Sequence, residues 1–458
     1  MGKAQTIFVC QQCGKESIKW LGHCPDCDGW NTFVESLRTA ASQTVTIHTS
    51  NTPRELCQIV DEDKPRLSVS MEEFDRVLGG GIVPGSLVLI GGDPGIGKST
   101  LLLQICAIIA HGHKKVLYVT GEESLGQMRL RAKRLGLEGE RLFVLSETNF
   151  ESILAHIQQV SPDLVIIDSI QTVYLDELGG APGSVGQIRE CTMRMMQWAK
   201  KANVPVLISG HVTKDGSIAG PRVLEHIVDV VLYLEGDPFS AYRLLRGVKN
   251  RFGSTNEVGI FEMKNEGLAE VANPSEVFLA QRSKETIGSA VVPTLEGTRP
   301  LLVEIQALTS TTSYGPPRRI ANGIDFNRLL LITAVLTKRA GLALGNQDIL
   351  VNVAGGLKVN EPAADLGIAL AIASSLHGVT IDPALVAIGE LGLSGELRAV
   401  PQPERRISEA AKLGFKRCIL PLTKRPNAPS SIELISAASV REALRMALPK
   451  GGDKASAA

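Results

Sequence analysis

The middle of the chain alternates between short apolar runs and segments with a helical apolar period. The runs predict buried strands at 86–90, 115–120, 142–145, 164–167 and 205–209, and the periodic segments predict helices at 99–110, 127–135 and 188–201. Strands and helices that alternate in this way favour a mostly parallel sheet covered by helices. Three further strands, at 230–234, 241–248 and 257–263, have no helix between them, so we expect the sheet to end in antiparallel hairpins.

A second globular unit is expected from about residue 288. Its apolar pattern predicts strands at 290–294, 301–308 and 349–353 and helices at 328–340 and 363–376. A polar stretch with no sustained apolar period precedes the first unit and is typical of a linker. The predicted organisation is a cysteine-containing unit at 1–31, a linker at 32–66, an α/β core at 67–275, a second α/β domain at 285–450 and a flexible tail at 451–458.

Composition narrows the class of protein. The 458 residues suffice for two to four domains, and 48 Lys and Arg residues balance 48 Asp and Glu residues. A net charge of zero argues against a uniformly basic nucleic-acid coat protein, but it leaves room for a local basic channel. The sequence has no apolar run of about 18 residues and no apolar secretory segment at its start, so we expect a cytoplasmic protein.

Four of the eight cysteines form two C-x2-C pairs near the start of the chain. Two such turns place four thiolates around one tetrahedral ion, at Zn–S distances of about 2.3 Å. Since four thiolates leave no open position for a catalytic water, we predict a structural zinc site. The alternative is unbound cysteines or a redox pair. The predicted metal ligands are Cys10, Cys13, Cys24 and Cys27.

A phosphate-binding loop follows the first strand of the core. The segment 92–99 matches G-x4-G-K-[ST] in full, and a helical segment begins at its Lys-Ser-Thr. The glycines let backbone N–H groups face the phosphates, aided by the helix N-terminus. Lys98 is expected to reach the β- and γ-phosphates of ATP, and Ser99 to bind Mg²⁺. The predicted nucleotide-binding residues are Gly92, Asp93, Pro94, Gly95, Ile96, Gly97, Lys98, Ser99, Thr100 and Asp168.

Polar residues at the ends of the following strands complete a hydrolytic site. Asp168 closes an apolar run, where an acid can hold the water shell of Mg²⁺. Glu122 and Glu123 follow the strand next after the phosphate loop, at the sheet edge where the γ-phosphate is expected. We predict Glu122 as the general base and Glu123 as the second choice; the alternative is acids that favour a helix N-terminus. His211 is a candidate sensor of the γ-phosphate.

Together these motifs resemble a RecA-type core, and the segment KNRFG at 249–253 resembles the signature of the bacterial RadA (Sms) family. The resemblance extends over nearly the whole chain. It implies a zinc finger, a RecA-like P-loop ATPase core and a Lon-protease-like C-terminal domain. It also implies that Lys249 and Arg251 lie near a subunit interface, where a cation stabilises transition-state charge on a neighbour's nucleotide. The alternative is a hairpin end with solvated basic residues.

The same resemblance implies the biological role. It points to a DNA-dependent ATPase with helicase-like action, a hexameric ring that promotes branch migration with RecA in homologous recombination and DNA repair. Two loops are candidates for contact with single-stranded and branched DNA: 176–187, with four glycines, and 212–222, with Lys214 and Arg222. Neither has a dense basic or aromatic pattern, so we expect contact with phosphates, independent of base sequence.

The C-terminal residues, about 288–448, resemble the proteolytic domain of Lon, most clearly at 356–372 and 395–421. The position of the Lon nucleophile is Ala363, which has no hydroxyl, and Glu404 stands approximately where Lon has its lysine. A Ser–Lys mechanism needs both groups, so protease activity is not expected. The resemblance implies a fold kept for ring assembly and as a basic platform for DNA. Candidates for that platform are Lys338, Arg339, Arg405 and Arg406.

Two other functions remain open at this point. One is a regulatory ATPase of the KaiC kind that acts on proteins and not on DNA, since the glycine-rich run at 79–85 suits either class. DNA-stimulated hydrolysis separates the two. The other is an ATP-dependent protease, which Ala363 disfavours and which ATP-dependent cleavage of casein would revive.

Overall fold

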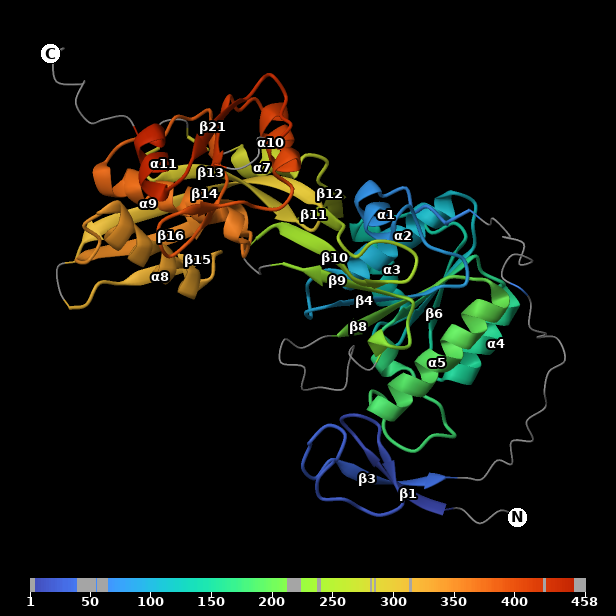
Figure 1. Ribbon diagram of the computed structural model, residues 1–458. Coiled ribbons are helices and arrows are strands. Elements are labelled where there is room, and N and C mark those ends of the chain that lie inside the picture. The colour runs from blue at the N-terminus through green and yellow to red at the C-terminus, as the bar shows by residue number, and fades with distance from the viewer. Residues whose placement is uncertain are drawn as a thin grey trace, which may run out of the picture. The chain divides into compact units, whose positions relative to one another are not determined.

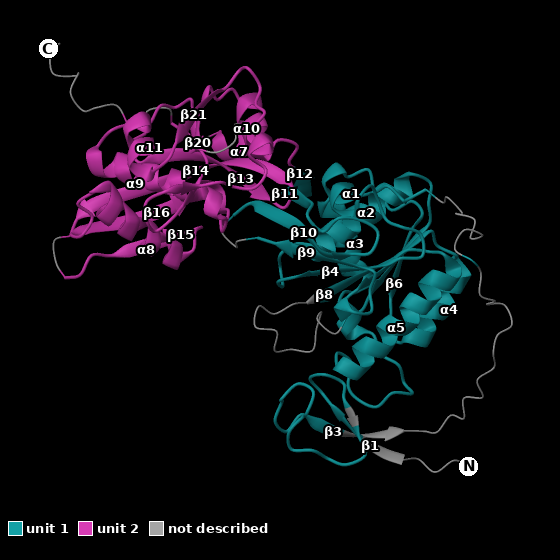
Figure 2. Cartoon of the chain, in the orientation of Figure 1, with its two compact units in different colours: residues 1–270 teal, residues 271–458 magenta. Residues whose placement is uncertain are grey.

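The computed structural model describes residues 5–38, 55, 65–211, 224–236, 240–280, 282–283, 286–312, 315–422 and 426–448. The chain divides into two compact units, residues 1–270 and 271–458, and each is described by itself (Figure 2). In the described ranges, no helix is both long enough and apolar enough to cross a membrane.

The cysteine-containing segment is a small antiparallel sheet. Its strands are β1 (Gln5–Cys10), β2 (Glu16–Ser17) and β3 (Phe33–Arg38), in the order β2-β1-β3. β3 pairs with β1 along its full length, from Phe33 opposite Cys10 to Arg38 opposite Gln5. The predicted boundary at residue 31 is therefore too early, because the strand that closes this sheet begins at Phe33.

The core of the first unit is a nine-stranded sheet in the order β12-β11-β10-β9-β4-β8-β7-β5-β6 (Figure 1). The six strands from β4 to β9 run parallel, and β10, β11 and β12 follow as antiparallel hairpins, as the sequence predicts. The strands are β4 (Leu87–Gly92), β5 (Val116–Thr120), β6 (Leu142–Ser146), β7 (Leu164–Asp168), β8 (Val206–His211), β9 (Val230–Glu235), β10 (Tyr242–Asn250), β11 (Val258–Lys264) and β12 (Gly267–Glu270).

Helices cover both faces of this sheet. The three helices predicted from periodicity are confirmed within a few residues. Two more helices, α1 and α4, and a short 3-10 turn, η2, were not predicted. The elements are α1 (Glu72–Leu78), α2 (Lys98–His111), α3 (Leu125–Arg134), α4 (Phe150–Val160), η2 (Ile170–Thr172) and α5 (Val185–Ala202).

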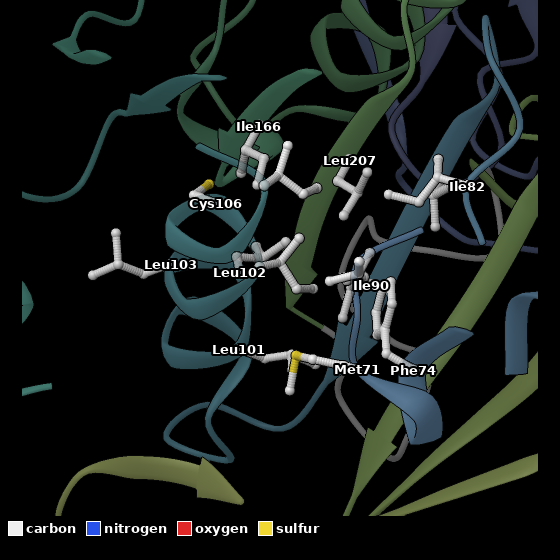
Figure 3. Close-up of a cluster of buried hydrophobic side chains, with 14 of the residues drawn as sticks. Met71, Phe74, Ile82, Ile90, Leu101, Leu102, Leu103, Cys106, Ile166 and Leu207 are labelled. Carbon is white, nitrogen blue, oxygen red and sulfur yellow. The ribbon is translucent and has the colours of Figure 1, made fainter. Parts of the chain in front are cut away.

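The apolar core lies in two layers, one on each face of the sheet. Successive side chains of a strand point to opposite faces of the sheet. In β4, Val88 and Ile90 therefore lie in one layer, and Leu87 and Leu89 lie in the other. The first layer holds α2, and Figure 3 shows its apolar side chains beside Ile90 and other residues of the sheet. Nine of the fourteen residues of α2 are buried. The helix that follows the phosphate loop is therefore fixed on nearly all sides.

The second unit has a mixed seven-stranded sheet in the order β15-β16-β14-β13-β17-β20-β21, with a two-stranded sheet of β18 and β19. Its strands are β13 (Ser289–Glu296), β14 (Arg299–Thr311), β15 (Arg319–Asn322), β16 (Gln347–Val353), β17 (Leu385–Ala387), β18 (Glu390–Leu391), β19 (Leu397–Arg398), β20 (Arg417–Pro421) and β21 (Glu433–Ala437). Its helices are α7 (Pro274–Leu279), α8 (Phe326–Val335), the π-helix η3 (Leu336–Ala340), the 3-10 turns η4 (Ala354–Gly356) and η5 (Pro362–Ala364), α9 (Asp365–His377), α10 (Pro403–Lys412) and α11 (Val440–Ala447).

Helix α7 shows where the second unit begins. Ser275 is fully buried, and its Oγ accepts a hydrogen bond from the Leu302 N–H of β14 at 3.1 Å. The predicted end of the core at residue 275 is therefore too late, because α7 packs on the sheet of the second unit. The predicted start of the second domain at 285 misses this helix.

Candidate active site and metal centre

The four cysteines of the first sheet lie close enough to share one ion. Their sulfur atoms are all within 4.8 Å of one another, with Cys10 and Cys27 3.6 Å apart and Cys13 and Cys24 3.5 Å apart. A tetrahedral ion with Zn–S bonds of about 2.3 Å separates its ligands by about 3.8 Å. The donor set and its spacing therefore fit zinc, and the predicted ligands are brought together.

The two C-x2-C turns have the same backbone geometry. The N–H of Gly14 donates to the Cys10 carbonyl at 2.9 Å, and the N–H of Asp28 donates to the Cys24 carbonyl at 2.9 Å. Both donors are in the left-handed region, with φ of 76° and 55°. Glycine suits this conformation, and aspartate is among the side chains that tolerate it. Each turn thus presents its pair of sulfur atoms to the same point.

Hydrogen bonds already favour one thiolate. Burial opposes charge on Cys10, but hydrogen bonds from Thr32 Oγ1 and from the backbone N–H groups of Cys13 and Gln12 lower the pKa of Cys10 to about 6. Burial raises the pKa of the Cys13 thiol, and the neighbouring sulfur atoms raise it further. A bound cation is what allows all four sulfur atoms to be thiolates at once.

The phosphate loop joins β4 to α2, as its sequence predicts. Gly92, Gly95 and Gly97 have φ of 150°, 75° and 115°, and a Cβ on Gly92 would lie 2.4 Å from the carbonyl oxygen of Leu234 on β9. A side chain at this position therefore cannot fit without moving the backbone of the adjacent strand.

Lys98 lies at the start of α2 and is 5% exposed. Its Nζ donates to the carbonyl oxygens of Gly92 at 2.8 Å and Asp93 at 3.0 Å. Burial lowers the pKa of Lys98, and the nearby carboxylates of Asp168 and Glu122 offset part of that effect. The ammonium group is thus held inside the loop, close to the predicted base Glu122 and to Asp168, which was predicted to hold the water shell of Mg²⁺.

Asp168 ends β7 and is held by two hydroxyl groups from neighbouring strands. The Tyr118 Oη of β5 donates to its Oδ2 at 2.5 Å, and the Ser209 Oγ of β8 donates to its Oδ1. Asp168 stands opposite Thr120 in the sheet register, and β8 pairs Ile90 of β4 with Ser209. Parallel strands therefore bring Asp168 to the same sheet edge as the phosphate loop.

The structure separates the two glutamates that follow β5. Glu122 accepts a hydrogen bond from Ser169 Oγ at 2.6 Å, beside Asp168. Glu123 instead forms an ion pair with Arg131 of α3, and its N–H donates to Thr120 Oγ1 at 3.1 Å. Glu122 therefore lies beside Asp168, whereas Glu123 is engaged by α3.

The backbone of His211 pairs with Gly92 of the phosphate loop at the end of β8. The His211 side chain and the loop 212–222, which carries Lys214 and Arg222, lie outside the described residues. The predictions of a γ-phosphate sensor and of this DNA-contacting loop therefore stay predictions.

The KNRFG segment lies at the opposite edge of the sheet from the phosphate loop of its own chain. Arg251 donates its backbone N–H to the carbonyl of Asp229, and the N–H of Asp229 donates to the Leu87 carbonyl at the start of β4. Gly92 is five residues further along β4, a distance of about 16 Å at 3.3 Å per residue. The two predicted cations thus cannot belong to the nucleotide site of the same chain.

Both cations of this segment are held in place. Lys249 Nζ donates to the carbonyl oxygens of Glu225 and of Val228, the latter at 2.7 Å, and burial lowers its pKa. Arg251 forms an ion pair with Asp229 at 3.2 Å, and Asp229 is 2% exposed. The Arg251 side chain is 47% exposed, so part of its guanidinium faces solvent.

The loop 176–187 is anchored at its end by a buried glutamine. Gln187, 1% exposed, donates to the carbonyls of Leu175 at 3.0 Å and Leu178 at 2.9 Å and accepts from the Leu175 N–H at 2.8 Å. Glu177 forms an ion pair with Arg194 of α5. The loop is therefore tied to the helix that follows it.

In the second unit, an alanine and a glutamate stand at the two positions that the resemblance to Lon implies for a catalytic pair. Ala363 is 2% exposed in η5, and Glu404 is exposed in the first turn of α10. Neither can act as a serine nucleophile or as its lysine base.

One predicted DNA-contacting residue is wrong. Arg406 is fully buried and forms a two-pronged ion pair with Glu361, with both N–O distances 2.6 Å. It also donates to the carbonyl oxygens of Pro293 at 2.8 Å and Pro401 at 3.0 Å. The guanidinium of Arg406 is buried and hydrogen-bonded within the second unit, so it cannot contact DNA. Arg405, Lys338 and Arg339 are exposed.

Sequence reasoning missed the residues that hold the catalytic groups in place. Tyr118, Ser169 and Ser209 each donate a hydrogen bond to a predicted carboxylate, and Asp229 holds Arg251. A polar residue at or near the end of a predicted buried strand was the available signal, because a buried hydroxyl or carboxylate needs a partner.

Three family models match parts of the chain. A model of the AAA domain matches residues 52–217, a model of the rubredoxin metal binding domain matches residues 8–35, and a model described as subunit ChlI of Mg-chelatase matches residues 330–424. The first spans the phosphate loop and Asp168, and the second spans the four cysteines.

Several proteins are similar along nearly the whole chain. The DNA repair protein RadA of Halalkalibacterium halodurans is 54% identical over 455 residues, covering 98% of this chain and 100% of that protein. The DNA repair protein RadA of Bacillus subtilis is 54% identical over 458 residues, with the same coverage. The protein of that name from Synechocystis is 47% identical over 481 residues, covering 98% and 95%. Among solved structures, a KaiC-like protein from Pyrococcus horikoshii is 21% identical with a TM-score of 0.38, covering 45% of this chain and 99% of that chain.

Proposed function

The chain belongs to the RadA family of DNA repair proteins, and from that premise we propose that it is a DNA-stimulated ATPase that acts on recombination intermediates. The observation that carries the proposal is the cluster at one sheet edge, where the phosphate loop, Asp168 and Glu122 meet around the buried ammonium of Lys98. Such a cluster has the parts that phosphoryl transfer to water needs.

Each residue has a separate task in hydrolysis. The N–H groups of the loop and Lys98 bind the β- and γ-phosphates. Ser99 and Asp168 would hold Mg²⁺, which when bound neutralises charge on the phosphate oxygens. Tyr118 and Ser209 fix the carboxylate of Asp168. Glu122 orients the attacking water and accepts its proton.

The cations of the KNRFG segment act on the nucleotide of a neighbouring copy. In support, the segment lies about 16 Å along β4 from its own phosphate loop, so only another subunit can bring it to a γ-phosphate. Lys249 or Arg251 then stabilises negative charge in the transition state. A ring, hexameric by family resemblance, is an arrangement that gives every site such a neighbour.

The DNA process follows from the family as well. We infer branch migration or unwinding, in cooperation with RecA, with single-stranded and branched DNA held by the loops 176–187 and 212–222. The zinc site is structural, and the second unit lacks the nucleophile and the base of a Ser–Lys protease, since Ala363 and Glu404 occupy those positions.

ATP turnover with and without single-stranded DNA, at low and at moderate salt, tests the proposal. Stimulation by DNA that weakens as salt rises is the expected result, because phosphate contacts release counterions. Turnover that is indifferent to DNA at both salts would refute a DNA motor and favour a protein-directed regulatory ATPase, with the nucleotide site unchanged.

A further inference from the structure

The turn η2 lies between the strand that ends at Asp168 and the loop 176–187. Ser169, the residue before η2, is 1% exposed, and its Oγ donates to Glu122 Oε1 at 2.6 Å. A hydroxyl bonded to a carboxylate at this distance makes a short, strong hydrogen bond. The hydroxyl therefore restricts the directions that the Glu122 carboxylate can take.

The Thr172 side chain of η2 packs directly on the turn that carries Glu122. The N–H of Gly121 donates to the Asp168 carbonyl at 3.2 Å, and Thr172 Oγ1 donates to the Ser169 carbonyl at 2.8 Å. A Cβ on Gly121 would lie 2.0 Å from Thr172 Oγ1, so the two turns touch with no room for another atom. A shift of η2 toward this turn would therefore displace the turn of Glu122.

The other end of η2 leads to the loop in a few residues. The Gln187 side chain accepts a hydrogen bond from the Leu175 N–H at 2.8 Å and donates one to the Leu175 carbonyl at 3.0 Å. On the way, the Tyr174 N–H donates to the Thr148 carbonyl at 2.9 Å, so the connection is held against the segment between β6 and α4. A displacement of the loop is thus passed along a short, hydrogen-bonded backbone to Ser169.

We propose that Ser169 is a positioning residue for Glu122 and that it links the state of the loop 176–187 to ATP hydrolysis. The hydroxyl keeps the carboxylate turned toward the γ-phosphate, and DNA on the loop adjusts this hydrogen bond through η2. The inference rests on the proposed role of Glu122 as the base. In this proposal, the stimulation of ATP hydrolysis by DNA depends on the Ser169–Glu122 hydrogen bond within one subunit. This effect is separate from the action of the cations that a neighbouring subunit supplies.

Steady-state and single-turnover hydrolysis by four variants of the full chain tests this inference. Ser169→Ala is expected to lower kcat about 10- to 150-fold, the equivalent of one hydrogen bond to a charged group, and to leave the KM for ATP nearly unchanged. The fold stimulation by single-stranded DNA is expected to fall toward one. Ser146→Ala is the matched control, because Ser146 Oγ bonds the backbone carbonyl of Glu123 and not a carboxylate.

The double variant Glu122→Gln/Ser169→Ala separates positioning from general damage. If Ser169 acts through Glu122, its removal adds nothing to the loss caused by Glu122→Gln. A wild-type kcat in Ser169→Ala, or a loss that persists in full in the Glu122→Gln background, overturns the proposal. Normal stimulation by DNA in Ser169→Ala overturns the link to the loop. Normal hydrolysis by Glu122→Gln alone overturns the base assignment itself, which is a separate result.

Discussion

The buried pair of Arg406 and Glu361 predicts that Arg406 stabilises the second unit and does not bind DNA. Arg406 is fully buried and makes four hydrogen bonds, two to Glu361 and one each to the carbonyls of Pro293 and Pro401. Arg406→Met removes the donor from the Glu361 carboxylate, whose side chain is only 22% exposed. It also removes the donor from the carbonyls of Pro293 and Pro401. Breaking such a pair costs about 3–5 kcal/mol. For a domain of this size that lowers Tm by about 6–20 °C.

Its neighbour on α10 is the matched control. Arg405 is exposed and donates one hydrogen bond, to the Thr298 carbonyl at 3.1 Å. Arg405→Met should change the free energy of unfolding by no more than about 0.5 kcal/mol. If the exposed arginine belongs to a basic platform, this variant alone should weaken DNA binding while remaining as stable as the parent.

Thermal unfolding of the full chain, followed by limited proteolysis to identify which unit unfolds, provides the measurement. The double variant Glu361→Leu/Arg406→Met should recover part of the loss, because two apolar side chains leave no unpaired buried charge. Equal stability of the Arg405→Met and Arg406→Met variants would refute the reasoning. So would an Arg406→Met variant of parental stability that has lost affinity for DNA.

Four further results are expected at the other sites. Lys98→Ala should abolish ATP hydrolysis, since the β- and γ-phosphates lose their main cationic partner, and normal turnover would remove the phosphate-loop assignment. Tyr118→Phe removes one donor to Asp168, so it should raise the Mg²⁺ concentration needed for half-maximal turnover severalfold, whereas an unchanged Mg²⁺ dependence would separate this hydroxyl from the metal site. Arg251→Ala should leave a folded protein with little DNA-stimulated turnover, and mixing it with Lys98→Ala subunits should restore activity in part, because each then supplies what the other lacks; no recovery would argue against action on a neighbour's site. Removal of zinc by a chelator, or Cys24→Ser, should unfold the N-terminal sheet, seen as loss of amide-exchange protection at β1 and β3, while intrinsic ATP turnover changes little.

Long apolar periods and complete motifs were enough to predict the centre of the fold. The strands β4, β5, β7 and β8 and the helices α2 and α5 appear where periodicity places them, because each buries a continuous face. Helix α4 was missed although Phe150, Ile153 and Ile157 lie on one buried face and the Asn149 side chain caps its first turn. The first turn of α1 is acidic, and this short helix has no side-chain cap that could mark its start.

The sequence predicted which residues form the site better than it predicted the contacts between them. From the sequence we predicted Glu122 as the base and Glu123 as the second choice, but the contacts that distinguish the two could not be predicted. Glu122 is bonded by Ser169, 47 residues away in the chain, and Glu123 is paired with Arg131 of α3. The same limit explains Arg406. An arginine next to another arginine on a polar helix is usually solvated, and only the fold shows that Glu361 lies beside it.

The burial of α2 has a consequence for genetics. Because nine of its fourteen residues are enclosed, most substitutions in this helix create cavities or overpacking, which lower the abundance of folded protein in the cell. Substitutions at Glu122, Ser169 or Arg251 leave the apolar core intact and change the rate per molecule instead. A survival screen scores both classes alike as loss of repair. Immunoblotting of the same strains would sort them, with low protein level marking the helix and normal level marking the hydrolytic machinery.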